Sequence, residues 1–151
     1  FRGVPLVARD EAVRDRLHAA GRVLSGPLMH ALTGIWQCGL DASPWTGSPV
    51  WIHGDLHPGN LVARGPELVA LIDFGDLTAG DPAYDLAVAW LAFDRPGRAL
   101  FHEATGGHYD EATWMRARAW AAAVALMLVQ QSDDDPAYRA LGEECIEQLA
   151  L

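Results

Sequence analysis

One segment of the chain, residues 51–76, holds most of the side chains that can do chemistry; it reads WIHGDLHPGNLVARGPELVALIDFGD. Asp55 lies in a predicted loop, Asn60 follows it closely, and Asp73 ends a second apolar run. Two carboxylates and one amide supply oxygen ligands, which suit Mg²⁺ and its accompanying phosphates better than a soft metal. The segment therefore predicts a phosphoryl-transfer site.

The order of these three residues matches the order in kinases, where a catalytic Asp precedes a Mg²⁺-binding Asn and a Mg²⁺-binding Asp-Phe-Gly. An isolated Asp in a Gly-Pro loop is more often a turn former, so the prediction rests on the three residues together. Asp76 and Asp81 are expected as capping and turn residues.

The string HGDLHPGN followed by IDFGD resembles the catalytic segment of the aminoglycoside phosphotransferase family, which are small-molecule kinases with a protein-kinase-like fold. The resemblance continues through GDPAYDLAVAW and, more weakly, along the helical remainder. It implies a mostly helical α+β fold, in which residues 1–151 form one kinase-like C-terminal lobe. A small β element of that lobe would carry the catalytic and metal-binding loops.

The resemblance also implies a role for each matching residue. Asp55 corresponds to the catalytic base that orients or deprotonates a substrate hydroxyl. Asn60 and Asp73 correspond to the ligands of Mg²⁺, and through it of ATP or GTP. Asp85 resembles the buried Asp that braces the catalytic loop from the following helix, and His53 resembles the structural His of that loop. The implied activity is phosphorylation of a small-molecule hydroxyl, with an aminoglycoside as the acceptor in the family's name.

The chain departs from a complete kinase of this kind in its nucleotide-holding parts. It contains no Lys, since all of its 11 basic residues are Arg, and no GxGxxG string precedes residue 51. Kinases use a strand Lys and a Gly-rich loop to hold the nucleotide phosphates. An N-terminal lobe, in a longer product or in a partner, is therefore expected to supply them. The alternative is a truncated or inactive lobe that acts as a binding or assembly module.

A second enzyme class is open, because His53-Gly-Asp55-Leu-His57 is an H-x-D-x-H string. Such a string can bind Zn²⁺ in a metallohydrolase, with Asp73 as a further ligand. The continuation Pro58-Gly59-Asn60 fits a phosphotransferase better, so the hydrolase is the lesser alternative.

Composition limits the partners. Half of the 151 residues are hydrophobic and 21% are charged, which indicates a folded domain with a core. A net charge of −9 disfavours nucleic acid or an anionic membrane and is compatible with a cationic substrate. The longest apolar run, residues 119–129, is too short to cross a bilayer. Cys38 and Cys145, without metal-ligand spacing or a signal peptide, predict reduced thiols in a cytoplasmic protein.

Short strands and capped helices are expected to position the site. Asp10 is expected to cap a first helix that buries residues up to Leu24, and Pro27 to lie in the first turn of a second. His102 and His108 are expected in an exposed polar connection. The remaining predictions are strands at 50–52, 61–63 and 68–72, a buried helix at 86–93, a helix at 111–131 after Asp110, and a last helix from Pro136.

Overall fold

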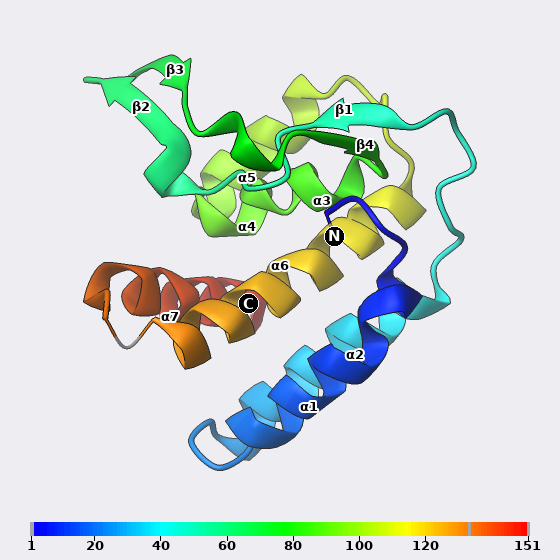
Figure 1. Ribbon diagram of the computed structural model, residues 1–151, viewed down its shortest axis with the longest axis vertical. Helices are drawn as coiled ribbons and strands as arrows, with labels where there is room; N and C mark the ends of the chain where they lie inside the picture. Colours follow the sequence, from blue (N-terminus) through cyan, green and yellow to red (C-terminus); the bar gives the residue numbers. More distant parts are fainter. Residues whose placement is uncertain (1, 133, 151) are drawn as a thin grey trace.

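The computed structural model describes residues 2–132 and 134–150, and its other helices pack around one long helix, α6 (Glu111–Gln131) (Figure 1). The other α-helices are α1 (Asp10–Ala20), α2 (Gly26–Asp41), α3 (Ala83–Leu86), α4 (Val88–Leu91), α5 (Arg95–Ala104) and α7 (Pro136–Ala150). Three single turns of 3-10 helix are η1 (Leu6–Arg9), η2 (Pro58–Asn60) and η3 (Phe74–Asp76).

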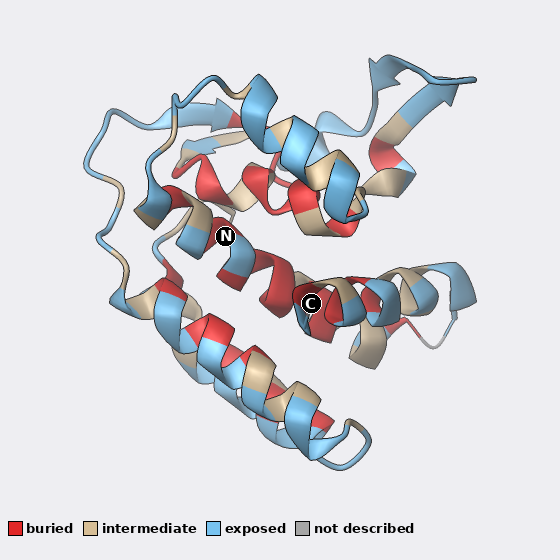
Figure 2. Cartoon of the chain, turned by 180° about the vertical axis from the view of Figure 1, so that it is seen from behind, coloured by how far each residue is buried: buried red, intermediate tan, exposed pale blue. Residues whose placement is uncertain are grey.

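Helix α6 is buried on several sides because alanines line most of it. Small side chains let the neighbouring helices approach closely. A Cβ added at Gly39 of α2 would collide with Ala119, and one added at Gly142 of α7 would lie 2.9 Å from Leu128. Figure 2 shows buried residues concentrated on α6, α3 and α4. The largest fully buried side chains are Val13, Leu32, Trp36, Thr113, Leu126, Cys145, Ile146 and Leu149.

Two small antiparallel sheets carry the loops of the 51–76 segment. Strand β1 (Val50–Ile52) pairs with β4 (Thr78–Gly80), and β2 (Leu61–Arg64) pairs with β3 (Glu67–Leu71). The chain leaves β1, forms the loop of residues 53–60, makes the β2–β3 hairpin and returns through residues 72–77 to β4. Both loops therefore lie between the same two sheets. The hairpin projects from the molecule and is exposed (Figure 2).

Much of the predicted architecture is confirmed, including the mostly helical α+β fold with a small β element. The three predicted strands are β1, β2 and β3 to within one residue, and the long helix is α6. Asp110 caps α6 by accepting a hydrogen bond from the Thr113 amide at 2.8 Å. Pro27 and Pro136 lie in the first turns of α2 and α7. Proline is tolerated there because the first turn has no acceptor for its missing N–H.

The predicted cap of the first helix is wrong. Asp10 is the first residue of α1, and its carboxylate instead accepts a hydrogen bond from Trp36 Nε1 and pairs with Arg14, both at 2.8 Å. The helix also ends at Ala20, so Leu24 packs on the core from the turn that follows. A partner on another helix outcompeted the local capping bond.

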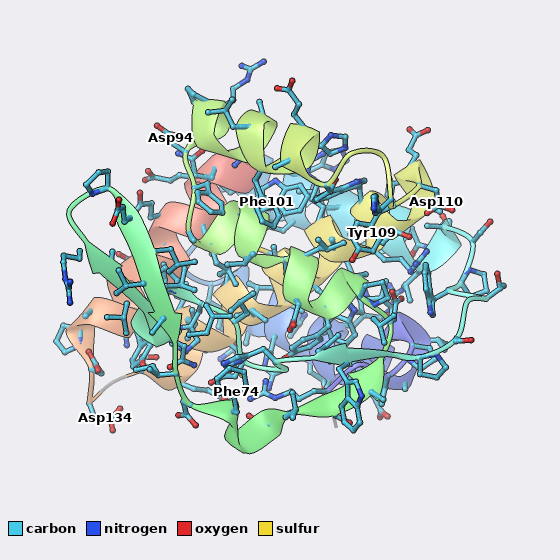
Figure 3. All side chains as sticks on the ribbon, turned by 90° about the horizontal axis from the view of Figure 1, so that it is seen from above. Phe74, Asp94, Phe101, Tyr109, Asp110 and Asp134 are labelled. Carbon is cyan, nitrogen blue, oxygen red and sulfur yellow. The ribbon has the colours of Figure 1, made fainter. Side chains whose placement is uncertain are left out.

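Two predictions between the sheets and α6 are also corrected. The helix expected at 86–93 is broken at Ala87 into α3 and α4. The polar connection contains α5, which carries the exposed His102 and begins at Asp94, whose carboxylate accepts from the Gly97 amide at 2.8 Å. Phe101 points from α5 toward the interior (Figure 3) and meets Trp114 edge-on. This aromatic contact holds α5 on the helical body.

The two thiols are free, with Cys38 exposed and Cys145 buried. Burial raises the pKa of Cys145 to about 12, so this thiol stays protonated and inert at neutral pH. Within the two described ranges, no helix has the length and apolarity needed to span a membrane.

A buried ion pair joins three parts of the fold. The Arg116 Nε of α6 lies 2.7 Å from Asp81 Oδ2, and the same guanidinium donates to the Ser43 carbonyl after α2. Asp81 also accepts from the Ala83 amide at 3.0 Å, at the start of α3. Burial of a charged pair is favourable only when both partners remain and their hydrogen bonds are complete.

Replacing Arg116 by Ala is expected to lower the free energy of unfolding by about 3 kcal/mol or more, because Asp81 would stay buried without its partner. Urea denaturation followed by circular dichroism measures this. Arg14→Ala removes a half-exposed pair with Asp10 and is expected to cost less than about 1 kcal/mol. Equal losses in the two variants would contradict the importance of the buried pair.

Candidate active site

The loop after β1 is held from inside by the His53 ring. His53 Nε2 donates to the Ile72 carbonyl at 2.8 Å, and Nδ1 accepts from the Asp55 amide at 3.3 Å. Both ring nitrogens are therefore occupied by backbone groups of the two site loops. Gly54 has φ +81°, and a Cβ there would collide with the Asp76 carbonyl, so only glycine fits this crossing.

Asp85 lies under the same loop, on α3. Its carboxylate accepts from the His53 amide at 2.6 Å and from the Gly54 amide at 3.0 Å. Burial raises the pKa of Asp85, and the two amide hydrogen bonds offset this rise only in part. The two N–H groups are thus satisfied by a single carboxylate that reaches them from the helix after β4.

The carboxylate of Asp55 is one-third exposed and only loosely held. Its nearest polar neighbours are Arg2 Nη2 at 3.4 Å, Asn60 Nδ2 at 3.4 Å and His57 Nε2 at 3.5 Å. All three contacts exceed the length of a strong charge-assisted hydrogen bond. The oxygens of Asp55 therefore keep lone pairs for a further hydrogen-bond donor.

Asn60 connects the two loops and is buried. Its Nδ2 donates to the Asp55 carbonyl at 2.8 Å, and its own carbonyl accepts from the Ile72 amide at 3.1 Å. Ile72 is the residue before Asp73, so Asn60 places the start of η3 beside the Asp55 loop. Its Oδ1 accepts no hydrogen bond from the residues that the structure describes.

Asp73 is the only non-glycine residue with positive φ among those described, with φ 59° and ψ 67°. This left-handed conformation is costly for a residue with a side chain and is common where a site demands it. Its exposed carboxylate accepts one long bond, from the Gly75 amide at 3.4 Å. Phe74, labelled in Figure 3, packs on the His53 ring at a centroid distance of 4.7 Å.

The donor set fits Mg²⁺ and does not fit zinc. Asn60 and Asp73 offer oxygen atoms with free lone pairs, and Mg²⁺ in proteins commonly takes one or two such ligands with waters and phosphates. In the part of the chain that the structure describes, no three His, Cys, Asp or Glu side chains gather to hold a metal by themselves. The H-x-D-x-H string does not present two imidazoles, because both nitrogens of His53 are engaged.

Sequence reasoning missed Arg2. Its guanidinium donates to the Tyr84 hydroxyl at 2.6 Å and to Asp76 Oδ2 at 2.9 Å, besides its long contact with Asp55. Burial acts to lower the pKa of Arg2, but Tyr84 and Asp76 together outweigh it and raise that pKa. The contacts span 53 to 82 residues of sequence, so no local pattern signals them. Asp76 was expected to be a capping or turn residue; its carboxylate instead accepts a hydrogen bond from Arg2.

A cavity of about 230 Å³ opens beside Asp55. Arg2, His57 and Tyr84 form its polar edge, and Asp55 is the only carboxylate among the described residues that line it. The remaining wall is mostly apolar and comes from α4, α6 and α7; its larger members are Leu91, Val124, Met127, Leu128 and Tyr138. A small molecule bound here would contact the Asp55 carboxylate. We call this space the Asp55 cavity.

Two comparisons with known proteins found a match. A family model described as "Phosphotransferase enzyme family" matches residues 4–120. Among solved structures, a macrolide 2'-phosphotransferase type I matches 98% of this chain with 26% identity and a TM-score of 0.55. The match covers 50% of that protein, so this chain spans half its length. No curated protein gives a significant match. The resemblance noted in the sequence is thereby confirmed.

Replacing Asp85 by Asn is expected to speed amide hydrogen exchange at His53 and Gly54 by about tenfold or more, since the NH2 group of Asn would replace one of the two oxygens that accept from these N–H groups. NMR-detected exchange measures both amides. Asp94→Asn is the control, because Asp94 caps the distant α5. Unchanged exchange in Asp85→Asn would mean that this carboxylate does not hold the loop.

Proposed function

Because this chain belongs to the phosphotransferase enzyme family, we propose that it carries the catalytic loops of a small-molecule O-phosphotransferase. The observation that supports this most is the position of Asn60. Its side chain binds the Asp55 carbonyl, while its backbone binds Ile72, directly before Asp73. The loop that carries Asp55 and Asn60 is thereby joined to the residue before Asp73, which supports one site served by all three side chains, as positioning and charge neutralisation in phosphoryl transfer require.

Asp55 is the proposed catalytic base. An acceptor hydroxyl in the Asp55 cavity would donate a hydrogen bond to its carboxylate, whose lone pairs are only weakly used by Arg2 and Asn60. As the hydroxyl oxygen bonds to the γ-phosphorus, the bond from that phosphorus to the β-phosphate oxygen breaks and Asp55 takes the proton. The products are a phosphate ester and a nucleoside diphosphate.

Asn60 and Asp73 are the proposed ligands of Mg²⁺ and, through it, of ATP or GTP. These two residues would hold the ion, which when bound would supply positive charge against the nucleotide phosphates. The left-handed backbone of Asp73 turns its carboxylate outward into solvent, where a phosphate can approach. His53 and Asp85 act indirectly in this proposal, by fixing the path of the loop that carries Asp55.

A nucleotide-clamping lobe is part of the proposal. The chain lacks Lys and spans half of the macrolide phosphotransferase that it resembles, so the whole of residues 1–151 is proposed as the C-terminal lobe. Apolar side chains in or beside the segment of residues 72–77, which we call the metal loop because it carries the proposed ligand Asp73, are exposed, among them Trp51, Phe74 and Leu77 at 76%, 51% and 50%. Such a patch marks an interaction surface. The same patch favours the second candidate, a binding module without its own activity.

The acceptor is a small molecule with a hydroxyl group. The name of the similar structure suggests a macrolide, and the family resemblance suggests an aminoglycoside and hence antibiotic resistance. The cationic acceptor and the cytoplasmic location stay predictions from composition. The Asp55 cavity contributes its own constraint, because its wall is largely apolar and its charged edge contains an arginine.

Asp73→Asn is expected to weaken binding of Mg²⁺ with a non-hydrolysable ATP analogue by about tenfold or more, because a neutral amide replaces a charged ligand. Isothermal titration calorimetry measures the affinity. Asp94→Asn is the control, because it has the same net charge as Asp73→Asn, and it should bind Mg²⁺ and the ATP analogue like the parent chain. Equal affinity in Asp73→Asn and the parent would refute the ligand role.

Asp55→Asn is expected to lower the turnover number by about 10²–10⁴-fold, since the base is lost while the shape is kept. Mg-nucleotide affinity should change by less than about twofold, because ground-state binding does not use this carboxylate. Transfer of a labelled γ-phosphate, in a form with a nucleotide-binding N-terminal lobe, measures turnover. A loss of affinity with unchanged turnover would reverse the two assignments.

A further inference from the structure

A second cavity, of about 350 Å³, lies next to the Asp55 cavity and is rich in arginine. Its charged lining residues are Arg2, Arg9, Arg16 and Asp76, and we call it the arginine cavity. Tyr84, Trp120, Ala123, Val124 and Met127 complete most of its wall. In Figure 1 the N-terminal segment that carries Arg2 passes over α6 between α1 and the segment before α3.

The position of these arginines follows from helix geometry. Arg9, Val13 and Arg16 are spaced i, i+4 and i+7 from the end of η1 along α1, which puts them on one face. Val13 on that face is buried against the core. The two guanidinium groups are thereby directed along the surface where α1 meets α6, toward Trp120.

The arginine cavity has an excess of positive charge in a chain whose net charge is −9. Asp76, its single lining carboxylate, is already paired with Arg2 at 2.9 Å. Burial lowers the pKa of Arg9, and the nearby charges of Arg16 and Arg2 lower it further, against an opposite effect of Tyr84. The Arg16 guanidinium makes no hydrogen bond or ion pair with residues 2–132 or 134–150. Positive charge gathered in this way attracts an anion.

The two cavities share a wall. Arg2, Tyr84, Val124 and Met127 line both of them. A molecule that places a hydroxyl at Asp55 therefore has the arginine cavity as its next available space. The apolar side chains of α6 on this wall would contact the body of such a molecule.

We infer that the arginine cavity binds a carboxylate or phosphate group of the acceptor, so that the substrate class is an anionic hydroxyl compound rather than a polycation. Arg16 and Arg9 would hold the anion, since guanidinium groups pair with both oxyanions in two-point contacts. This inference rests on the proposed function for the role of Asp55, whereas the anion site itself does not depend on it.

The test is an NMR titration of the chain of residues 1–151 that follows the indole N–H of Trp120. This residue lines the arginine cavity, and its Nε1 is buried without a hydrogen-bond partner in the described structure, so a nearby anion should shift its resonance. The probes are inorganic phosphate, 3-hydroxybenzoate and the neutral 3-hydroxybenzamide. Both anions are expected to give saturable shifts. The neutral amide is expected to bind at least about tenfold more weakly than 3-hydroxybenzoate. Preference for phosphate or for carboxylate identifies the anion.

Arg16→Gln is expected to weaken anion binding by about tenfold, because a charged hydrogen-bonding group is lost. Arg14→Gln is the matched control on the same helix, since Arg14 is half-exposed and pairs with Asp10. Arg9→Gln gives the same test if Arg16→Gln does not fold. No saturable shift, equal affinity in Arg16→Gln and Arg14→Gln, or tighter binding of an aminoglycoside than of either anion would overturn the inference.

Asp73→Asn separates this inference from the proposed function. It should leave the Trp120 titration unchanged while weakening Mg-nucleotide binding. Anion binding lost in Asp73→Asn would place the anion at the metal loop and overturn the inference. Anion binding kept in a chain that never binds Mg-nucleotide would support the site and count against the proposed function alone.

Discussion

The backbone of Ile72 is held on both sides by the loop that carries Asp55. Its carbonyl accepts from the His53 ring at 2.8 Å, and its amide donates to the Asn60 carbonyl at 3.1 Å. The two small sheets share no strand, so these bonds connect them through their loops. Because Asp73 follows Ile72 directly, any movement of either loop would change the distance between the proposed base and the proposed metal ligand.

This connection depends in turn on the helical body. Asp85 projects from α3 to the amides of His53 and Gly54, and α3 packs on α6. The buried pair of Arg116 with Asp81 fixes the start of α3 on the same long helix. Polar groups with incomplete hydrogen bonding are costly to bury. The pair of Arg116 with Asp81 therefore limits the positions open to α3, and Asp85 on α3 in turn limits those open to the loop that carries Asp55. The strained backbone of the residue after Ile72 is maintained by this chain of contacts.

The sequence alone predicted the parts of the fold that local chemistry determines. Asp110 and Pro136 mark the starts of α6 and α7 because caps and first-turn prolines act within a few residues. Strand β4 was missed because Thr78–Gly80 is too short and too small to show a pattern. Helix α5 did have a signal, Asp94 followed by Pro96, which the polar composition of the region obscured.

The candidate site likewise contains residues that local sequence order predicts and one that it does not. Asp55, Asn60 and Asp73 lie within 19 residues, so their order was enough to bring them to attention. Arg2 contacts Asp55 across 53 residues of sequence, and this contact depends on the N-terminal segment crossing α6, which no local rule predicts.

The net charge of the chain does not predict the local charge around a cavity. A net charge of −9 favours a cationic ligand for the chain as a whole, yet three arginines line the arginine cavity beside the Asp55 cavity. A bound group responds to the charges within a few ångströms more than to distant ones, because salt screens the latter. Arg2 lines both cavities and contacts Asp55. A charge that enters the arginine cavity would therefore change the electrostatic environment of the Asp55 carboxylate. Under the two proposals, acceptor recognition and proton removal would be linked through the Arg2 guanidinium group.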